Sequence, residues 1–282
     1  MKLAVLADIH ANFAALQTVT AHIDAWRPDQ VIVAGDVVNR GPRPAECLRF
    51  VQERQRSRGW RVVRGNHEEY VMTHAQPDAP RSGPPFELHR GSFWTYQQLG
   101  CDVSDLEAMP LHLSLPAPDG GEVRVTHASM RSTRDGVYRR TTDEELPEQI
   151  GLPAPGLFCV GHTHIPLVRR LNGTLVVNAG SVGLPFDRDT RAAYAQIEWR
   201  PAGSHSDAAQ WHAEIIRLDY DRRQAERDFY DTGFMDGTPL AQLVLVELRT
   251  ARSQLFEWAH RYEPRILSGE LTMQESVREF MG

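Results

Sequence analysis

The sequence predicts an α/β fold: a four-layer α/β/β/α sandwich, in which two mostly mixed β-sheets stack face to face between flanking helices, followed by a helical C-terminal tail. Strand-like apolar runs alternate with helical patterns in the first part of the chain, and beyond about Leu111 strands follow one another directly. From Tyr220 the pattern becomes helical again. We therefore expect a main domain over residues 1–219 and a helical extension over residues 220–282, packed on or beside it.

Short runs rich in β-branched and apolar residues predict the strands. They are Lys2–Ala7, Val31–Ala34, Trp60–Arg64, Glu122–Thr126, Leu157–Val160, Thr174–Asn178, Ala192–Trp199 and Trp211–Leu218. Apolar residues at helical spacing predict helices over Ala14–Trp26 and Pro44–Arg58, with Pro44 in the first turn. The first three strands and these two helices indicate a βαβαβ unit with a parallel sheet.

The rest of the chain contains two predicted loops and two predicted tail helices. Thr73–Pro85 is rich in proline and small polar residues, which is typical of a surface loop, and Pro201–Ala208 is expected to form an exposed hairpin tip. In the tail, Leu240–Tyr262 is predicted to form one long amphipathic helix and Thr272–Phe280 a short last one.

Composition limits the possible functions. With 41% hydrophobic and 24% charged residues and no long apolar run, the sequence is typical of a globular protein that does not enter the membrane. The formal charge of −6 argues against a general nucleic-acid binder, because that role needs a basic surface, but it is compatible with a small phosphorylated substrate.

The expected location is the cytoplasm. The apolar opening Leu3–Ala7 is too short for the apolar core of a signal peptide and has no cleavage site after it. The three cysteines, Cys47, Cys101 and Cys159, are widely spaced, which suits neither a disulfide framework nor a zinc finger. We expect them to be reduced and structural.

Two pairs of polar residues follow predicted buried strands. Asp8 and His10 come after the first strand, and His162 and His164 come after the strand at Leu157–Val160. Residues two apart in an extended chain point to the same face, so each pair is expected to converge on one point. Either pair alone is a weak signal, because a polar residue at a strand end is more often a turn or capping residue.

Three further strands also end in side chains that can bind a metal. These side chains are Asp36 after Gly35, Asn66 and His67 after Gly65, and His127. Ligands of α/β sheets gather outside the carboxyl ends of the strands, where all of these groups are expected to lie. The glycines Gly35, Gly65 and Gly161 allow the close backbone approach that a crowded site needs.

The side-chain types predict the kind of metal. Carboxylate, amide oxygen and imidazole without thiolate suit manganese, iron, zinc or nickel. The candidate ligands are too many for one ion, which indicates two ions about 3.5–4 Å apart, bridged by a carboxylate. Asp36 is the candidate bridge. Two metal ions in this arrangement are typical of hydrolysis at phosphorus.

These motifs resemble those of the calcineurin-like metallophosphoesterase superfamily, and they occur in the family's order. They stand here as Asp8-Ile9-His10, Gly35-Asp36, Gly65-Asn66-His67-Glu68, Thr126-His127-Ala128 and Gly161-His162-Thr163-His164. The match covers roughly the first two thirds of the chain, so the main domain would be the catalytic one. The resemblance implies two divalent metal ions, most readily manganese or iron, with zinc or nickel as alternatives.

The resemblance also implies how the ligands divide. One metal would bind Asp8, His10, Asp36 and His164, and the other Asp36, Asn66, His127 and His162. A hydroxide bridging the metals would attack phosphorus in line with the leaving oxygen, which His67 would stabilise or protonate.

Gly35–Pro42 looks like the GDxxDRG element of phosphoprotein phosphatases and of bacterial diadenosine tetraphosphatases. In that element the arginine binds substrate phosphate, which makes Arg40 the candidate phosphate contact, with a surface ion pair as the alternative. Arg131, shortly after His127, is a second candidate. Asn39 replaces the usual aspartate of the element, which puts the expected support of His67 in question.

A second departure concerns the subgroup. His127-Ala128-Ser129, followed later by the double histidine, looks more like the small bacterial phosphodiesterase branch than like protein phosphatases. Two neighbouring residues have two interpretations each. Glu68 either faces the metals or begins a helix, with the helix favoured. Asn12 either caps a helix or touches substrate, with the cap favoured.

The leading hypothesis is a two-metal phosphoesterase that hydrolyses a phosphodiester or phosphoanhydride of a small nucleotide. The enzymatic alternative is a phosphomonoesterase or a protein serine/threonine phosphatase. A scaffold that keeps the fold and binds partners without catalysis is the alternative from another class; it would usually lack metal ligands, and none is missing here.

Overall fold

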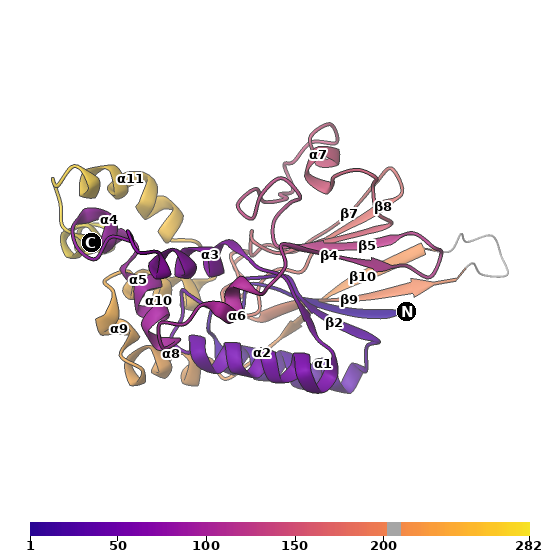
Figure 1. Cartoon of the computed structure of the whole chain (residues 1–282), viewed down its shortest axis with the longest axis horizontal. Helices are drawn as coiled ribbons and strands as arrows, with labels where there is room; N and C mark the ends of the chain where they lie inside the picture. The colour runs from indigo at the N-terminus through magenta and orange to yellow at the C-terminus, as the bar shows by residue number, and fades with distance from the viewer. Residues whose placement is uncertain (202–209) are drawn as a thin grey trace.

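The computed structural model describes residues 1–201 and 210–282 and contains two mixed five-stranded sheets stacked face to face (Figure 1). The strand order is β10-β9-β1-β2-β3 in the first sheet and β4-β5-β6-β8-β7 in the second. The first sheet comprises β1 (Lys2–Leu6), β2 (Gln30–Val33), β3 (Arg61–Val62), β9 (Ala192–Arg200) and β10 (Gln210–Leu218). The second comprises β4 (His112–Pro116), β5 (Glu122–Thr126), β6 (Leu157–Val160), β7 (Leu167–Leu171) and β8 (Thr174–Asn178). The predicted layered α/β fold is confirmed.

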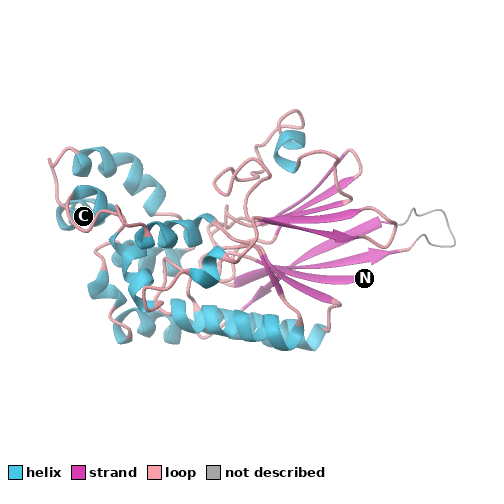
Figure 2. Cartoon of the chain, in the orientation of Figure 1, coloured by secondary structure: helices cyan, strands magenta, loops and turns pink. Residues whose placement is uncertain are grey.

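The helices are distributed unevenly around the sheets (Figure 2). Those of the main part of the chain are α1 (Phe13–Trp26), α2 (Pro44–Arg58), α3 (Asn66–Met72), the 3₁₀ turn η1 (Thr73–Ala75), α4 (Pro84–Leu88), α5 (Arg90–Gln98), α6 (Ser104–Glu107) and α7 (Leu146–Ile150). Those of the tail are α8 (Arg222–Asp231), α9 (Phe234–Gly237), α10 (Ala241–Thr250), α11 (Leu255–Leu267) and α12 (Met273–Met281). Within the described residues, none of these helices is long and apolar enough to cross a membrane.

The predicted βαβαβ unit forms one side of the first sheet, from β1 in the middle to the edge strand β3. β1 pairs with β2 and β2 pairs with β3, both in parallel. Pro44 is at the start of α2, as predicted, and Asn12 caps α1 because its side chain accepts a hydrogen bond from the N–H of Ala15 (3.1 Å). The cap interpretation of Asn12 is therefore confirmed.

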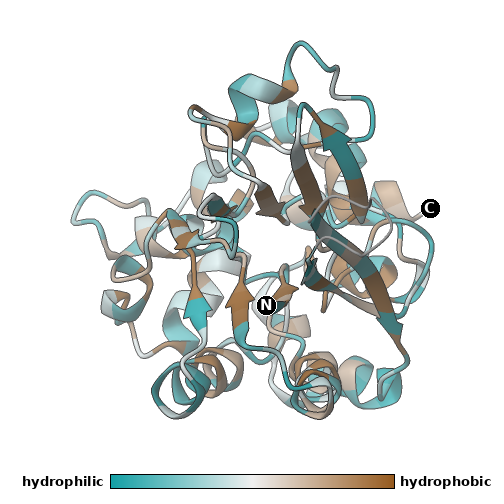
Figure 3. Ribbon diagram, turned by 90° about the vertical axis from the view of Figure 1, so that its right-hand side faces the viewer, coloured by the Kyte–Doolittle hydropathy of each residue, from teal (hydrophilic) through white to brown (hydrophobic). Residues whose placement is uncertain are grey.

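The central strands β1, β2, β6 and β8 have continuous apolar sequences because they are buried on both faces. In β1, Leu3 and Val5 point into the core between the sheets, whereas Ala4 and Leu6 point to the outer core beneath α1 and α2. The outer face of the second sheet is covered by the segment that contains α7. Figure 3 shows the result: the strands are largely hydrophobic, and the loops are largely hydrophilic.

Two edge strands were not predicted from the sequence, because their patterns are mixed. β4 and β7 each pair on one side only, antiparallel to a neighbour, and several of their residues are exposed. The loop prediction for Thr73–Pro85 was only partly right, since η1 and the start of α4 lie within it. The predicted hairpin tip at Pro201–Ala208 lies almost wholly outside the described residues.

The prediction of one helix over Leu240–Tyr262 was wrong. α10 ends at Thr250, Ala251 adopts a left-handed conformation with φ 49°, and α11 begins at Leu255. Glu247 explains the break physically. Its buried Oε1 accepts hydrogen bonds from the N–H groups of Gln254 (2.7 Å) and Leu255 (2.9 Å), so a side chain of α10 satisfies the start of α11. The predicted last helix corresponds to α12.

The tail packs into a shared core with the main part of the chain. Phe229, Phe234 and Trp258 of the tail belong to one buried cluster with Trp94 of α5 and Leu184 of the loop before β9. Figure 1 shows α8–α11 beside α3, α4 and α5 at one end of the sandwich. The tail thereby lies at the end of the molecule where the strands of the βαβαβ unit finish.

We predict that Glu247→Ala lowers the free energy of unfolding by about 1–2 kcal/mol, because two N–H groups at the start of α11 lose their acceptor. Urea denaturation of the purified variant measures this. Glu257→Ala is the matched control: Glu257 is exposed in the first turn of α11, and its loss should change stability by less than about 0.5 kcal/mol. Equal stabilities of the two variants would contradict the prediction.

Candidate metal centre

All seven predicted ligands lie together at the carboxyl ends of the parallel strands, in the loops between the sheets and the helical end of the molecule (Figure 2). They are Asp8 and His10 after β1, Asp36 after β2, Asn66 at the start of α3, His127 after β5, and His162 and His164 after β6. All are buried except His162, which is half-buried.

The first half of the site brings four donors close together. Single ligand atoms of Asp8, His10, Asp36 and His164 all lie within 4.8 Å of one another. The Nε2 atoms of His10 and His164 are 3.1 Å apart, and Oδ2 of Asp36 is 3.6 Å from Nε2 of His10. Oδ1 of Asp8 is 3.7 Å from Nε2 of His164.

The second half is centred on the amide oxygen of Asn66. Its Oδ1 lies 2.9 Å from Nε2 of His127 and 3.0 Å from Nδ1 of His162. Oδ2 of Asp36, which faces His10 in the first half, is also 3.3 Å from Nε2 of His127. One carboxylate oxygen therefore borders both groups of donors, which is the position required of a bridging ligand.

Backbone carbonyls fix the orientation of three imidazoles. The Nδ1 atoms of His10, His127 and His164 contact the carbonyls of Asn39 (3.3 Å), Ala34 (2.8 Å) and Leu184, respectively. A carbonyl only accepts, so each Nδ1 carries a proton, and when the imidazole is neutral its Nε2 offers a lone pair to the centre. This is the tautomer that a metal ligand needs.

Several polar atoms of this cluster are not satisfied by the protein itself, and bound cations would satisfy them. Two Nε2 lone pairs, those of His10 and His164, face each other at hydrogen-bond distance. Oδ2 of Asp8 is buried and has no hydrogen-bond partner among the described residues. A divalent ion would satisfy both the facing nitrogens and this oxygen, and the donor types are those of manganese, iron, zinc or nickel.

The pKa values of the clustered side chains are also shifted from their ordinary values. Burial raises the pKa of Asp8 well above its ordinary value and lowers the pKa of His10 to about 3. Burial acts against ionisation at Asp36 and His127 too, but there the mutual attraction of the two groups outweighs it. The pKa of Asp36 is lowered, and that of His127 is raised to about 10. A proton on His127 thus occupies the place of a cation.

The calcineurin-like phosphoesterase superfamily domain matches residues 1–200 of the chain. The chain belongs to this superfamily. A metallophosphoesterase of known structure from Sphaerobacter thermophilus is similar to it with a TM-score of 0.67 and 26% identity, over 89% of this chain and 100% of that one.

Two sequence relatives extend the comparison. An uncharacterized protein of Methanocaldococcus jannaschii is 25% identical over 241 residues, which are 79% of this chain and 89% of that protein. The asymmetrical bis(5′-nucleosyl)-tetraphosphatase of Bacillus subtilis is 26% identical over 217 residues, with 63% of this chain and 85% of that protein covered. The predicted family is confirmed, and the chain is a metal-dependent phosphoesterase, a hydrolase of phosphate esters.

The backbone of the candidate ligands differs from the extended conformation that the sequence predicted. Neither pair lies in extended chain. Asp8 (φ 53°), His10 (φ 46°), His162 (φ 67°) and His164 (φ 57°) all adopt left-handed conformations after their strands have ended, as does Asp36 (φ 56°). Such conformations cost of order 1–3 kcal/mol each for residues other than glycine. The expected convergence occurs, but turns rather than strand pleating produce it.

All three predicted glycines permit the crowding. A Cβ on Gly35 would lie 2.5 Å from Nδ1 of His127. A Cβ on Gly65 would lie 2.1 Å from Oδ1 of Asp36, and a Cβ on Gly161 would lie 2.8 Å from Oδ2 of Asp8. Real Cβ atoms do not approach oxygen so closely, so a larger residue at either position would displace a carboxylate of the cluster.

Glu68 begins a helix and also positions the cluster. It is the third residue of α3, fully buried, and its carboxylate accepts hydrogen bonds from the N–H groups of Gly65 (2.8 Å), Asp36 (2.9 Å), Val37 (2.8 Å) and Val38 (3.2 Å). The favoured helix interpretation is confirmed. The second role, which holds the loop after β2 against α3, was not evident from the sequence.

Asn39 still supports His67, although it is not an aspartate. Its Oδ1 accepts from the N–H of Arg40 (2.9 Å), which can only donate, so the amide nitrogen must face His67. That nitrogen lies 2.9 Å from Nδ1 of His67. Nδ1 therefore accepts, and the proton of the neutral imidazole is on Nε2.

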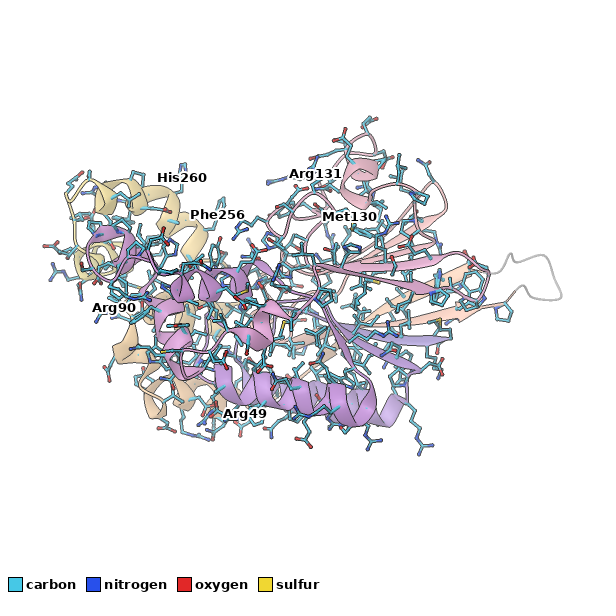
Figure 4. All side chains as sticks on the ribbon, in the orientation of Figure 1. Arg49, Arg90, Met130, Arg131, Phe256 and His260 are labelled. Atoms are coloured by element: carbon cyan, nitrogen blue, oxygen red, sulfur yellow. The ribbon has the colours of Figure 1, made fainter. Side chains whose placement is uncertain are left out.

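The two candidate arginines lie in different surroundings. Arg40 is half-buried, and its positive charge contributes to the lowered pKa of His10, His67, His162 and His164, after the larger effect of burial. The guanidinium of Arg131 binds Asp135 (2.6 Å) and lies near Glu145 and Glu148 beside α7 (Figure 4). These contacts do not support the phosphate-binding role expected for Arg131.

Further residues orient the ligands and were missed by the sequence analysis. The ring of Phe186 stacks on His164, with 4.2 Å between centroids. Asn178, at the end of β8, donates to the carbonyl of Gly161 (2.6 Å) and to Oγ1 of Thr163 (3.0 Å), which fixes the turn that carries His162. Asn178 ends an apolar strand, and that signal could have identified it.

We predict that Gly65→Ala weakens metal binding by at least roughly tenfold, because the added methyl group displaces the Asp36 carboxylate. Metal content after dialysis measures the loss, and circular dichroism checks the fold. Gly156→Ala is the matched control, since the nearest atom to its Cβ is 3.6 Å away and far from the ligands. Undiminished metal content in Gly65→Ala would contradict the close approach.

We also predict that Mn²⁺ binding releases at least one proton near neutral pH, because both His127 and Asp8 have raised pKa values in the metal-free protein. His127 is protonated in the metal-free protein because its pKa is raised to about 10, and a metal ligand must be neutral. Affinity should therefore rise with pH, by at least about tenfold per unit, up to the pKa of His127. Calorimetry in buffers of different ionisation enthalpy counts the protons; a pH-independent affinity would exclude this exchange.

Proposed function

We propose that this phosphoesterase uses two divalent metal ions to hydrolyse a phosphodiester or phosphoanhydride of a small nucleotide. The observation that carries the proposal is the position of Oδ2 of Asp36 between two groups of donors, 3.6 Å from His10 and 3.3 Å from His127. Manganese and iron are the first candidates for the metals, and zinc and nickel the alternatives.

The donors divide into two sets that share Asp36. Asp8, His10, Asp36 and His164 would hold one ion, whereas Asp36, Asn66, His127 and His162 would hold the other. The bound ions would supply Lewis acidity toward the phosphoryl oxygens and a water of lowered pKa for attack in line with the leaving oxygen. The presence of the full donor set argues against a scaffold without catalysis.

Two residues beside the cluster would bind the substrate. His67 holds its proton on Nε2 because Asn39 donates to Nδ1, so His67 can donate a hydrogen bond to the leaving oxygen. Its ring lies 4.8 Å from that of His10, within reach of a group bound at the metals. Arg40 would contact phosphate oxygens with its guanidinium.

The substrate class follows from chemistry and from the relatives. The chain is acidic overall, with a formal charge of −6, which suits a small substrate better than long nucleic acid. The Bacillus subtilis relative is named for action on bis(5′-nucleosyl) tetraphosphates, which supports a nucleotide anhydride here.

The free cysteines Cys47, Cys101 and Cys159 support a cytoplasmic location.

The test is hydrolysis by metal-stripped protein re-supplied with Mn²⁺. We expect turnover of bis(p-nitrophenyl) phosphate and diadenosine tetraphosphate to exceed that of p-nitrophenyl phosphate. Asp36→Asn keeps the shape of the side chain but removes its charge, and it should lower kcat/KM by at least roughly a hundredfold. Turnover that needs no metal, or that survives in Asp36→Asn, would overturn the proposal, and preference for the monoester would favour a phosphomonoesterase.

The same assay distinguishes the roles of Arg40 and Arg131. Arg40→Gln should lower kcat/KM by roughly 10- to 100-fold, as expected for the loss of a charge-assisted hydrogen bond to phosphate. Arg131→Gln is the matched control and should leave kcat/KM nearly unchanged, because the Arg131 guanidinium is engaged by Asp135. Equal effects of the two substitutions would contradict the role given to Arg40.

A further inference from the structure

A cavity of about 210 Å³ adjoins the metal centre on the side of the C-terminal helices. Asn39, Arg40 and His67 form one wall of it, so the cavity begins at the residues proposed to bind the phosphate and the leaving oxygen. The opposite wall comes from α9, α10 and α11 of the tail. The part of a substrate that leaves from phosphorus would therefore extend toward the tail.

The walls of the cavity are mainly aromatic and aliphatic. Tyr70 of α3 and His89 lie on the main-domain side, and Phe234, Leu255 and Trp258 lie on the tail side. Phe234, Leu255 and Trp258 are buried, so their positions are set by the packing of the tail core. Flat, apolar walls of this kind suit a ring system, because every aromatic ring has a face that can stack.

Two buried polar atoms on these walls have no partner. Nε1 of Trp258 and Oγ1 of Thr238 are inaccessible to solvent and form no hydrogen bond within the described residues, although both side chains line the cavity. Trp258 is 3% and Thr238 2% exposed. The indole N–H is a donor and the hydroxyl is both donor and acceptor. Both atoms lie beneath the surface of the cavity wall, so a ligand with a polar edge would satisfy them after a small shift of that wall.

Size and chemistry restrict the occupant further. The cavity is smaller than the pockets of about 300–1,000 Å³ that hold whole drug-sized ligands, so it accepts one part of a substrate. An alkyl chain would leave the Trp258 and Thr238 atoms unsatisfied, whereas a nucleobase presents both acceptors and donors along its edge.

We propose that this cavity binds the base of the nucleotide substrate, so that the C-terminal helices determine recognition of the nucleoside part of the leaving group. This inference rests on the proposed function, because it places the base relative to the phosphate bound at the metals. The ring would stack between the aromatic walls, and a small shift of the wall would bring Nε1 of Trp258 and Oγ1 of Thr238 to its polar edge.

The test compares AMP with ribose 5-phosphate, which differ only in the base. Their affinities for the Mn²⁺-loaded full chain are measured by calorimetry, which needs no turnover, and as inhibition of bis(p-nitrophenyl) phosphate hydrolysis. We expect AMP to bind at least about tenfold more tightly. Trp258→Phe and Thr238→Val each remove one polar atom and should weaken AMP binding by roughly three- to tenfold, with ribose 5-phosphate unchanged.

Two further variants keep the result interpretable. Trp211→Phe is the matched control, because Trp211 is also buried with an unpartnered Nε1 but lies in the core between the sheets, and it should not alter AMP binding. Ala259→Trp, at a half-buried position on the cavity wall, should fill the cavity and abolish the difference between AMP and ribose 5-phosphate.

The outcomes separate this inference from the proposed function. Equal binding of AMP and ribose 5-phosphate while the Mn²⁺-dependent hydrolysis persists would overturn the base site and leave the function standing. Octyl phosphate that binds as tightly as AMP, with no effect of Trp258→Phe, would overturn it in favour of an apolar leaving group. Base-dependent AMP binding without hydrolysis of any substrate would support the base site and overturn the function.

Discussion

The buried carboxylate of Asp36 connects almost every part of the site. Its Oδ1 accepts a hydrogen bond from the N–H of His67 (2.9 Å), whereas its Oδ2 faces both groups of metal donors. Its own backbone N–H is held by Glu68, and Gly65 lies so close that no side chain fits between them. Displacement of this one carboxylate would therefore disturb the candidate metal donors, His67 and the start of α3 together.

Several features of the site lower the stability of the folded state, and packing elsewhere in the fold must offset this loss. Five ligands have left-handed backbone conformations, and two carboxylates and several imidazoles are buried in a small volume. The surrounding strands are apolar on both faces and closely packed, which supplies the needed stability. Cations bound at the cluster would further stabilise the folded state by mass action, since the unfolded chain has no preformed site.

The sequence predicted that the candidate ligands would gather at one place, because each follows a buried strand and strand ends are easily recognised. The order of the motifs then identified the family. The conformation of the ligands could not be predicted, because nothing in Asp8-Ile9-His10 signals a left-handed turn; neighbouring loops impose it through contacts such as the hydrogen bond from the N–H of His10 to the carbonyl of Asp36 (3.0 Å).

Other features could not be predicted from the sequence because tertiary contacts determine them. The break after Thr250 depends on the Glu247 carboxylate, whose local sequence is an ordinary helical pattern. The edge strand β7 contains Arg169 and Arg170 between apolar residues, and pairing with β8 determines its conformation. The amide orientation of Asn39, and with it the tautomer of His67, depends on the N–H of Arg40.

The tail provides one wall of the cavity beside the metal centre, while the ligands all come from the first 164 residues. Under the proposed function, the two tasks of an enzyme, bond cleavage and choice of substrate, would be encoded in consecutive and largely separate stretches of the chain. Mutations that accumulate in α9–α11 can redirect such an enzyme to new leaving groups without touching the reaction centre. For a lineage of phosphoesterases, this separation makes the tail a natural place for specificity to diverge while the chemistry is inherited intact.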